Sequence, residues 1–174
     1  PRVAFRNLGN LRFEECGAVW GFNDMGVTHG MALADLDNDG DLDVLMNSLN
    51  ERARVYRNDS SAPLIAVRLK GRAPNTRGIG AKILVHGGAV PVQSQEMMSG
   101  GRYLSGDDNV RVFAAGAATN GMTIEVRWRD GRNSTVSNVI ANRVYEIDEA
   151  GAAIPAAKVT PALSSPFFKD VSQL

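Results

Sequence analysis

The sequence predicts an all-β fold in two parts, and three observations lead to this prediction. Short runs of alternating apolar and polar residues recur along the chain, and turn-forming NG, DG and GG pairs separate them. The 174 residues include 18 glycines, which suits many tight turns. No segment keeps the 3.6-residue apolar period of a long helix. The length suits one domain or two small ones.

Composition excludes several functional classes. Lysine plus arginine equals aspartate plus glutamate at 19 each, so the zero net charge argues against a nucleic-acid partner. Cys16 is the single cysteine, which rules out an intramolecular disulfide, and we expect it to be a small buried residue. No apolar run approaches the roughly 20 residues of a membrane span. The chain opens on Pro1 rather than Met, so we expect a fragment of a larger protein, and the lack of a signal peptide gives no information on where that protein is located.

The second part, residues 62–150, carries the clearest strand patterns. The run MTIEVRW at 122–128 alternates cleanly between hairpin-type turns, and it places Ile124, Val126 and Trp128 on one face. We expect an antiparallel sandwich or barrel of about seven strands, with a short helix near Ser137–Asn142. The predicted strands are Ile65–Lys70, Ala81–His86, Val90–Glu96, Val110–Phe113, Thr123–Trp128 and Arg143–Ile147.

The first part, residues 1–61, contains a weak internal repeat. AFRNLGN (4–10) resembles VYRNDSS (55–61), and RFEECGAV (12–19) resembles FFKDVSQL (167–174). These matches predict the tail of one repeat, one full repeat, an insertion and the first strand of another repeat. Residues 151–174 are therefore interpreted as a linker, rich in Ala, Pro and Ser, followed by that possible strand.

The most specific feature is the acidic stretch ALADLDNDGDLDVLM at residues 32–46. Aspartates occupy every second position, and Gly40 falls where a tight turn needs a positive φ angle. Hard cations take six to eight oxygen ligands, so this spacing predicts a Ca²⁺ loop. The predicted ligands are the side chains of Asp35, Asp37, Asp39 and Asp43, and the backbone carbonyl of Asp41, whose carboxylate would face solvent.

The acidic stretch fits a calcium loop between strands better than it fits an EF-hand, a magnesium site or a solvated turn. An EF-hand needs a glutamate at loop position 12 and flanking helices, whereas this chain has Met46 there and strand-like flanks. Magnesium would demand stricter octahedral geometry, and the loop has no cysteine or histidine for softer metals. An Asp-rich solvated turn would need only one or two aspartates. We expect a structural ion, because protein oxygens leave no obvious open position.

The residues now support a resemblance to known families. GMALADLDNDGDLDVLMNSLNERARVYRN resembles an FG-GAP/VCBS-type repeat, the calcium-loop repeat of integrin-α-like β-propellers. NTRGIGAKILVHGG (75–88), SGGRYLSGDD (99–108), EVRWRDGR (125–132) and NVIANRVYEIDEA (138–150) resemble the ASPIC/UnbV module. That resemblance implies calcium loops, a secreted, extracellular or periplasmic setting, and a role in adhesion or assembly.

The expected function is therefore a calcium-binding, non-catalytic interaction or adhesion module of a larger secreted protein. Its partner would be a protein or glycan, or a second copy paired through open sheet edges. Two alternatives remain open. A carbohydrate-binding module would use a Gly-rich loop with Arg102, Tyr103, Asp107 and Asp108. An accessory protein or enzyme of natural-product biosynthesis would need an open coordination position, although no Ser-His-Asp or Cys-His set is evident.

Overall fold

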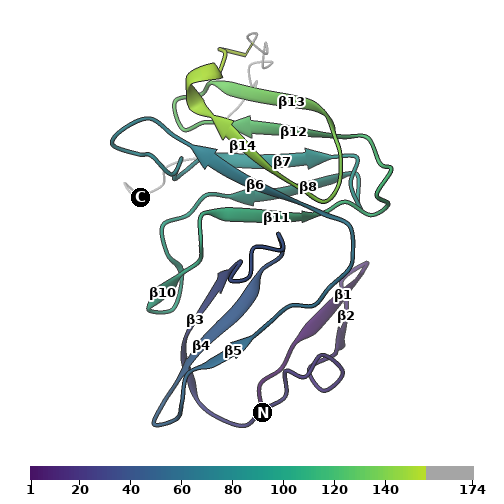
Figure 1. The fold of residues 1–174 in the computed structure, drawn as a ribbon, viewed down its shortest axis with the longest axis vertical. Coiled ribbons are helices and arrows are strands. Elements are labelled where there is room, and N and C mark those ends of the chain that lie inside the picture. The colour runs from purple at the N-terminus through teal and green to yellow at the C-terminus, as the bar shows by residue number, and fades with distance from the viewer. Residues whose placement is uncertain (156–174) are drawn as a thin grey trace, which may run out of the picture.

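The computed structural model describes residues 1–155, which form β-strands joined by turns (Figure 1). The predicted all-β fold is confirmed: within these residues the one helical element is a 3-10 turn at Glu149–Gly151, and no helix has the length and apolar character needed to cross a membrane. The strands are β1 (Phe5–Gly9), β2 (Arg12–Glu15), β3 (Thr28–Ala34), β4 (Asp43–Ser48), β5 (Arg54–Tyr56), β6 (Leu64–Lys70), β7 (Lys82–His86), β8 (Val92–Glu96), β9 (Gly101–Arg102), β10 (Ser105–Gly106), β11 (Val110–Ala114), β12 (Met122–Arg127), β13 (Asn133–Val139) and β14 (Arg143–Asp148).

Seven strands of the second part form a two-layer sandwich, and β9 and β10 form a separate hairpin. One sheet has the order β11-β6-β14 and the other has the order β13-β12-β7-β8. Alternating side chains of β6, β7 and β12 meet between the layers, and for β12 this is the face that the run at 122–128 predicted. The core consists of Ile65, Val67, Leu69, Ala81, Ile83, Val85, Met97, Phe113, Ala115, Met122, Ile124, Val126, Trp128, Val139 and Ile147.

Two details of the sandwich differ from the prediction. No described sheet closes into a barrel, because each sheet keeps two edge strands. In addition, β14 runs parallel to β6, with Arg143 opposite Ile65 and Asp148 opposite Lys70, so the sheet is not purely antiparallel. The chain leaves β13 at the edge of one sheet and crosses to the other, where β14 starts at the same end as β6.

The predicted strands are all present, with ends shifted by at most two residues. The predicted helix at Ser137–Asn142 is wrong, because Ser137–Val139 belong to β13 and the next residues form a turn. β13 carries mostly polar side chains at an edge, and a bulge against β12 interrupts its register. Both features weaken the period-two pattern by which a strand is recognised.

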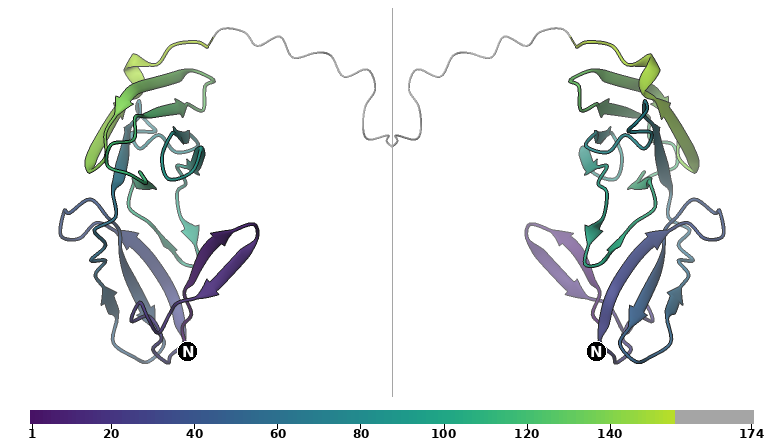
Figure 2. Two further views of the ribbon diagram at one scale, coloured as in Figure 1. Left: turned by 90° about the vertical axis from the view of Figure 1, so that its right-hand side faces the viewer. Right: turned by 90° about the vertical axis from the view of Figure 1, so that its left-hand side faces the viewer.

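The first part of the chain forms the antiparallel sheet β3-β4-β5 and the separate β1–β2 hairpin. The hairpin projects from the rest of the chain and its residues are all exposed (Figure 2). The buried Arg2 ties the N-terminal segment to this sheet by donating hydrogen bonds to Thr28 Oγ1 and Ser48 Oγ. Cys16 is buried and unpaired, as expected.

Candidate metal centre and neighbouring surfaces

The acidic loop connects β3 to β4, in the place that the sequence predicted. The strands pair in a hairpin whose last register position is Ala34 opposite Asp43. Gly40 has a φ angle of 97°, and Asn38 has a φ angle of 64°, so two residues of the loop adopt the left-handed region. A Cβ on Gly40 would meet only Leu64 Cδ1, at an ordinary contact distance of 3.8 Å, so steric space does not require glycine here. The positive φ angle is what favours glycine at this position.

The loop brings three of the predicted side-chain ligands together. Asp35, Asp37 and Asp39 each offer a carboxylate oxygen, and these oxygens lie within 4.8 Å of one another. The backbone N–H of Gly40 donates to Asp35 Oδ2 at 3.1 Å, which helps to fix the turn. The second oxygen of Asp35 is buried and has no hydrogen-bond partner. Three converging carboxylates with such an oxygen form an arrangement that a hard cation can stabilise.

Asp43 has a different environment from these three aspartates. It is only 1 % exposed, and its two oxygens accept backbone hydrogen bonds from Leu36 at 2.9 Å and Asn58 at 2.8 Å. Its carboxylate therefore joins the acidic loop to the chain that follows β5. No residue pattern signals the role of Asn58, because the group that donates is a backbone N–H.

Asp41 departs from the prediction that its carboxylate faces solvent. The residue is 4 % exposed, and neither carboxylate oxygen has a hydrogen-bond partner. Burial, together with the negative charges of Asp39, Asp43, Asp37 and Asp35, raises the pKa of Asp41 to about 6. An ionised Asp41 is therefore costly unless a positive charge lies beside it.

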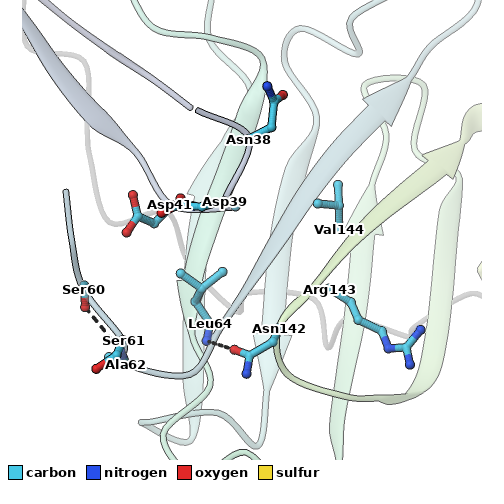
Figure 3. A pocket seen from close by; sticks show the side chains of 11 residues that line it. Asn38, Asp39, Asp41, Ser60, Ser61, Ala62, Leu64, Asn142, Arg143 and Val144 are labelled. Atoms are coloured by element: carbon cyan, nitrogen blue, oxygen red, sulfur yellow. Dashed lines mark hydrogen bonds between the residues drawn. The ribbon is translucent and has the colours of Figure 1, made fainter. Parts of the chain in front are cut away.

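The loop faces the start of the sandwich across a shallow cavity of about 400 Å³ (Figure 3). Asp39 and Asp41 line one side, and Leu64, Asn142 and Arg143 line the other. Asn142 Oδ1 accepts a hydrogen bond from the Leu64 N–H at 3.3 Å, while the Arg143 side chain points away from the two aspartates (Figure 3). The acidic loop thus lies where the two parts of the chain meet.

The residues of the predicted Gly-rich ligand loop make contacts within the chain. Asp107 Oδ1 accepts hydrogen bonds from Arg102 and from the backbone N–H of Leu33 on β3. Asp108 Oδ1 accepts from the neighbouring Asn109 N–H at 2.6 Å. Tyr103 is 74 % exposed at the turn between β9 and β10. The four residues are close in sequence, but only Tyr103 keeps its polar group free of a hydrogen bond to the described chain.

The hairpin that carries these residues also contacts β3 through Ser105. The Ser105 hydroxyl donates to the carbonyl of Met31 at 2.6 Å and accepts a hydrogen bond from the Met31 N–H at 3.3 Å. The Asp108 N–H donates to the Leu33 carbonyl at 2.9 Å. These bonds attach the sandwich to the edge of the β3-β4-β5 sheet. No sequence pattern indicated them, because they join residues 74 or more positions apart.

Comparison with known proteins finds a match for the sandwich part of the chain. No curated protein matches the chain. The matching segment of a family model runs from the turn after β6 through β14 and the 3-10 turn, and it does not include the acidic loop. This agrees with the ASPIC/UnbV part of the predicted resemblance and leaves the repeat part as a prediction. Residues 71–154 thus match the family described as ASPIC and UnbV.

Proposed function

We propose that the acidic loop binds one structural Ca²⁺ ion and that the chain is a non-catalytic interaction module of a secreted protein. The observation that carries the metal proposal is the state of Asp35 and Asp41. Three of their four carboxylate oxygens are buried without a hydrogen-bond partner. Burying ionised carboxylates in this way is unfavourable by several kcal/mol unless a cation or donor compensates.

The chemistry of the ligand set favours calcium. Asp35, Asp37 and Asp39 supply converging oxygens, and the loop contains no imidazole or thiolate. Calcium accepts irregular sets of six to eight oxygens, whereas magnesium requires near-octahedral geometry. Asp41 adds either its carboxylate or its carbonyl, and Asp43 holds the loop closed through Leu36 and Asn58. Bound calcium would supply positive charge that stabilises the ionised carboxylates.

The interaction role is supported by the apolar surface of the first part of the chain. Phe5, Phe13 and Trp20 are between 48 % and 60 % exposed, although aromatic side chains are usually buried. Contiguous exposed apolar groups on a folded protein commonly mark contact surfaces. Further exposed apolar residues in this part are Val3, Leu8, Leu11, Val19, Met25, Val27, Leu36, Leu49 and Val55.

The direct test is calcium titration of the metal-free chain. Calorimetry should show one site, and calcium at 100 times its Kd should stabilise the fold by about 2.7 kcal/mol. For a chain of this size, that corresponds to a rise of roughly 5–10 °C in Tm. Magnesium at the same concentration should raise Tm less. An unchanged Tm with both ions would contradict the structural-ion proposal.

Matched substitutions separate the loop from general charge effects. Asp39→Asn should abolish most of the calcium-dependent rise in Tm, because it removes one converging carboxylate. Glu146→Gln removes an exposed carboxylate on β14 that makes no hydrogen bond or ion pair within residues 1–155. The Glu146→Gln variant should respond to calcium like the original chain. Equal responses from both variants would place the calcium elsewhere.

A further inference from the structure

A small cavity opens between β3, β8 and β11, beside the β9–β10 hairpin, with a volume of about 320 Å³. All of its lining residues belong to the described part of the chain, and the predicted linker and strand at 156–174 lie outside that part. The lining combines two arginines, Arg102 and Arg111, with apolar side chains of Leu33, Leu42, Met98 and Val110. We propose that this cavity binds a small organic monocarboxylate and that Arg111 holds its carboxylate.

Arg111 is the most buried charged residue that lines the cavity. It is 9 % exposed, because it lies two positions from the core residue Phe113 and so shares its inward face of β11. Its Nε donates to the Glu96 carbonyl at 3.2 Å, and its Nη1 donates to the carbonyls of Asp108 and Val110, both at 2.9 Å. Within residues 1–155, Nη2 donates no hydrogen bond and Arg111 makes no ion pair with a carboxylate.

The charge of Arg111 therefore lacks a direct counter-charge. An arginine stays protonated, so it cannot relieve its burial by losing a proton. Burial lowers the pKa of Arg111 and outweighs the negative charges of Asp107 and Asp108, which act to raise it. A buried cation without a paired anion is unfavourable, and a carboxylate bound at Nη2 would supply the missing charge.

Arg102 adds a second cation to the same cavity. Its Nε donates to Asp107, whose Oδ1 also accepts from the Leu33 N–H, so this carboxylate is already engaged. The terminal nitrogens of Arg102 donate no hydrogen bond within the residues that the structure describes. The positive charge of Arg102 also acts to lower the pKa of Arg111, so each cation lies within the field of the other. A carboxylate between them would relieve this repulsion.

The lining favours one negative charge on an apolar body. Because Asp107 engages Arg102, Arg111 is the cation that lacks a carboxylate, and a single negative charge matches it. A dianion such as phosphate would bring a second charge close to Asp107 and Glu96, which also line the cavity. A planar carboxylate suits the guanidinium fork, and the apolar side chains suit a carbon skeleton. Benzoate combines these properties and serves as the probe.

Titration of the full chain with benzoate, followed by two-dimensional NMR, tests the site. Benzoate should shift the Arg111 Nε–H signal and the backbone amides of Gly100, Gly101 and Val110 in a saturable manner. Benzamide, which has the same shape without the charge, and inorganic phosphate should each bind about tenfold more weakly or worse. No saturable shift, or equal binding of benzamide or phosphate, would overturn the proposal.

Substitutions assign the binding to Arg111. Arg111→Gln should lower benzoate affinity about tenfold or more, because it removes the charge that holds the carboxylate. Arg68→Gln is the matched control: Arg68 is an exposed arginine of β6, opposite Val110 in the register, and its loss should leave the affinity unchanged. Equal affinities in Arg111→Gln and the original chain, or equal losses in the two variants, would overturn the proposal.

A second variant leaves the hydrogen bonds of Arg111 intact. Met98 lines the cavity and is 52 % exposed, so Met98→Trp should fill part of the cavity without disturbing the core. Benzoate affinity should fall about tenfold, and an unchanged affinity would contradict the proposed location. The titrations are repeated with calcium and with excess chelator, and the affinities should agree. Binding that needs calcium would place benzoate on the ion and overturn the proposal, whereas failure of the proposed metal site would leave benzoate binding intact.

Discussion

Asp107 Oδ1 accepts a hydrogen bond from the Leu33 backbone N–H at 2.9 Å, and this bond joins the residue after β10 to β3. The same carboxylate pairs with Arg102, which holds it in place. Ser105 makes the equivalent connection to Met31. A side-chain carboxylate and a hydroxyl thus bind backbone groups of β3 that would otherwise face outward. These bonds help to hold the two parts of the chain together.

Replacing Asp107 should therefore weaken the fold. Asp107→Ala leaves the half-buried Leu33 N–H without its acceptor and Arg102 without its carboxylate, so we expect the free energy of unfolding to fall by about 1–3 kcal/mol. Urea denaturation measures this change. Glu146→Ala, on the exposed face of β14, should change it by less than about 0.5 kcal/mol. Similar losses from the two variants would mean that the contact with β3 contributes little.

Asp107 should also contribute to acid sensitivity. Burial acts to raise its pKa, but hydrogen bonds from Arg102 and the Leu33 N–H outweigh burial and hold the pKa below the usual 3.8. A lowered folded-state pKa adds stability above the unfolded pKa, and this stability is lost as pH falls through the folded pKa. Between about pH 5 and pH 3, the original chain should lose stability more steeply than Asp107→Asn. Parallel pH profiles in urea denaturation would contradict this assignment.

Asp41→Asn should stabilise the metal-free chain. Without metal at neutral pH, the substitution removes a buried charge surrounded by four carboxylates, so stability should rise by about 1–3 kcal/mol. Because the pKa of Asp41 in the folded chain is raised to about 6, the stability that protonated Asp41 provides is lost as pH rises through that value. Removing the charge should therefore stabilise the metal-free chain at neutral pH.

Calcium affinity then reports how Asp41 takes part in the site. Asp41→Asn keeps the backbone carbonyl and removes the charged carboxylate. A loss of tenfold or more in calcium affinity would show that the carboxylate stabilises the ion. Unchanged affinity would favour the carbonyl as the contact, as the spacing of the loop predicted. Calorimetry at a fixed pH above 7 keeps proton release from obscuring the comparison.

Gly78→Ala tests the turn that precedes β7. Gly78 has a φ angle of 64°, and an added Cβ would lie 3.1 Å from Leu69 and from Trp128. Gly131, in the turn between β12 and β13, has a φ angle of 86° with no atom within 4 Å of the added Cβ. Gly131→Ala should lower stability by about 1–2 kcal/mol through backbone strain alone.

The difference between the two glycines isolates the effect of packing. Gly78→Ala should destabilise the fold more than Gly131→Ala, because Leu69 and Trp128 belong to the sandwich core and must move. Thermal unfolding of the two variants gives the comparison. Equal losses would mean that the core accommodates the extra methyl group without strain. The result also bears on the RGIGAKI stretch, whose glycines serve a turn in this fold.

Local sequence patterns determined much of this protein. Alternation in MTIEVRW predicted a strand with one buried face, and Met122, Ile124 and Val126 lie in the core. The spacing of Asp35, Asp37 and Asp39 before Gly40 predicted a turn that gathers carboxylates. These features can be read from sequence because side-chain direction repeats every two residues and positive φ angles favour glycine.

The tertiary structure decided the features that join distant segments. The parallel pairing of β14 with β6, the burial of Asp41 and the bond from Leu33 to Asp107 all depend on chain crossings that local periodicity does not encode. β13 was missed for a related reason, since an edge strand with a bulge lacks clean alternation. Sequence specified which groups could bind a cation or form a strand, and packing decided which of them became buried, paired or exposed.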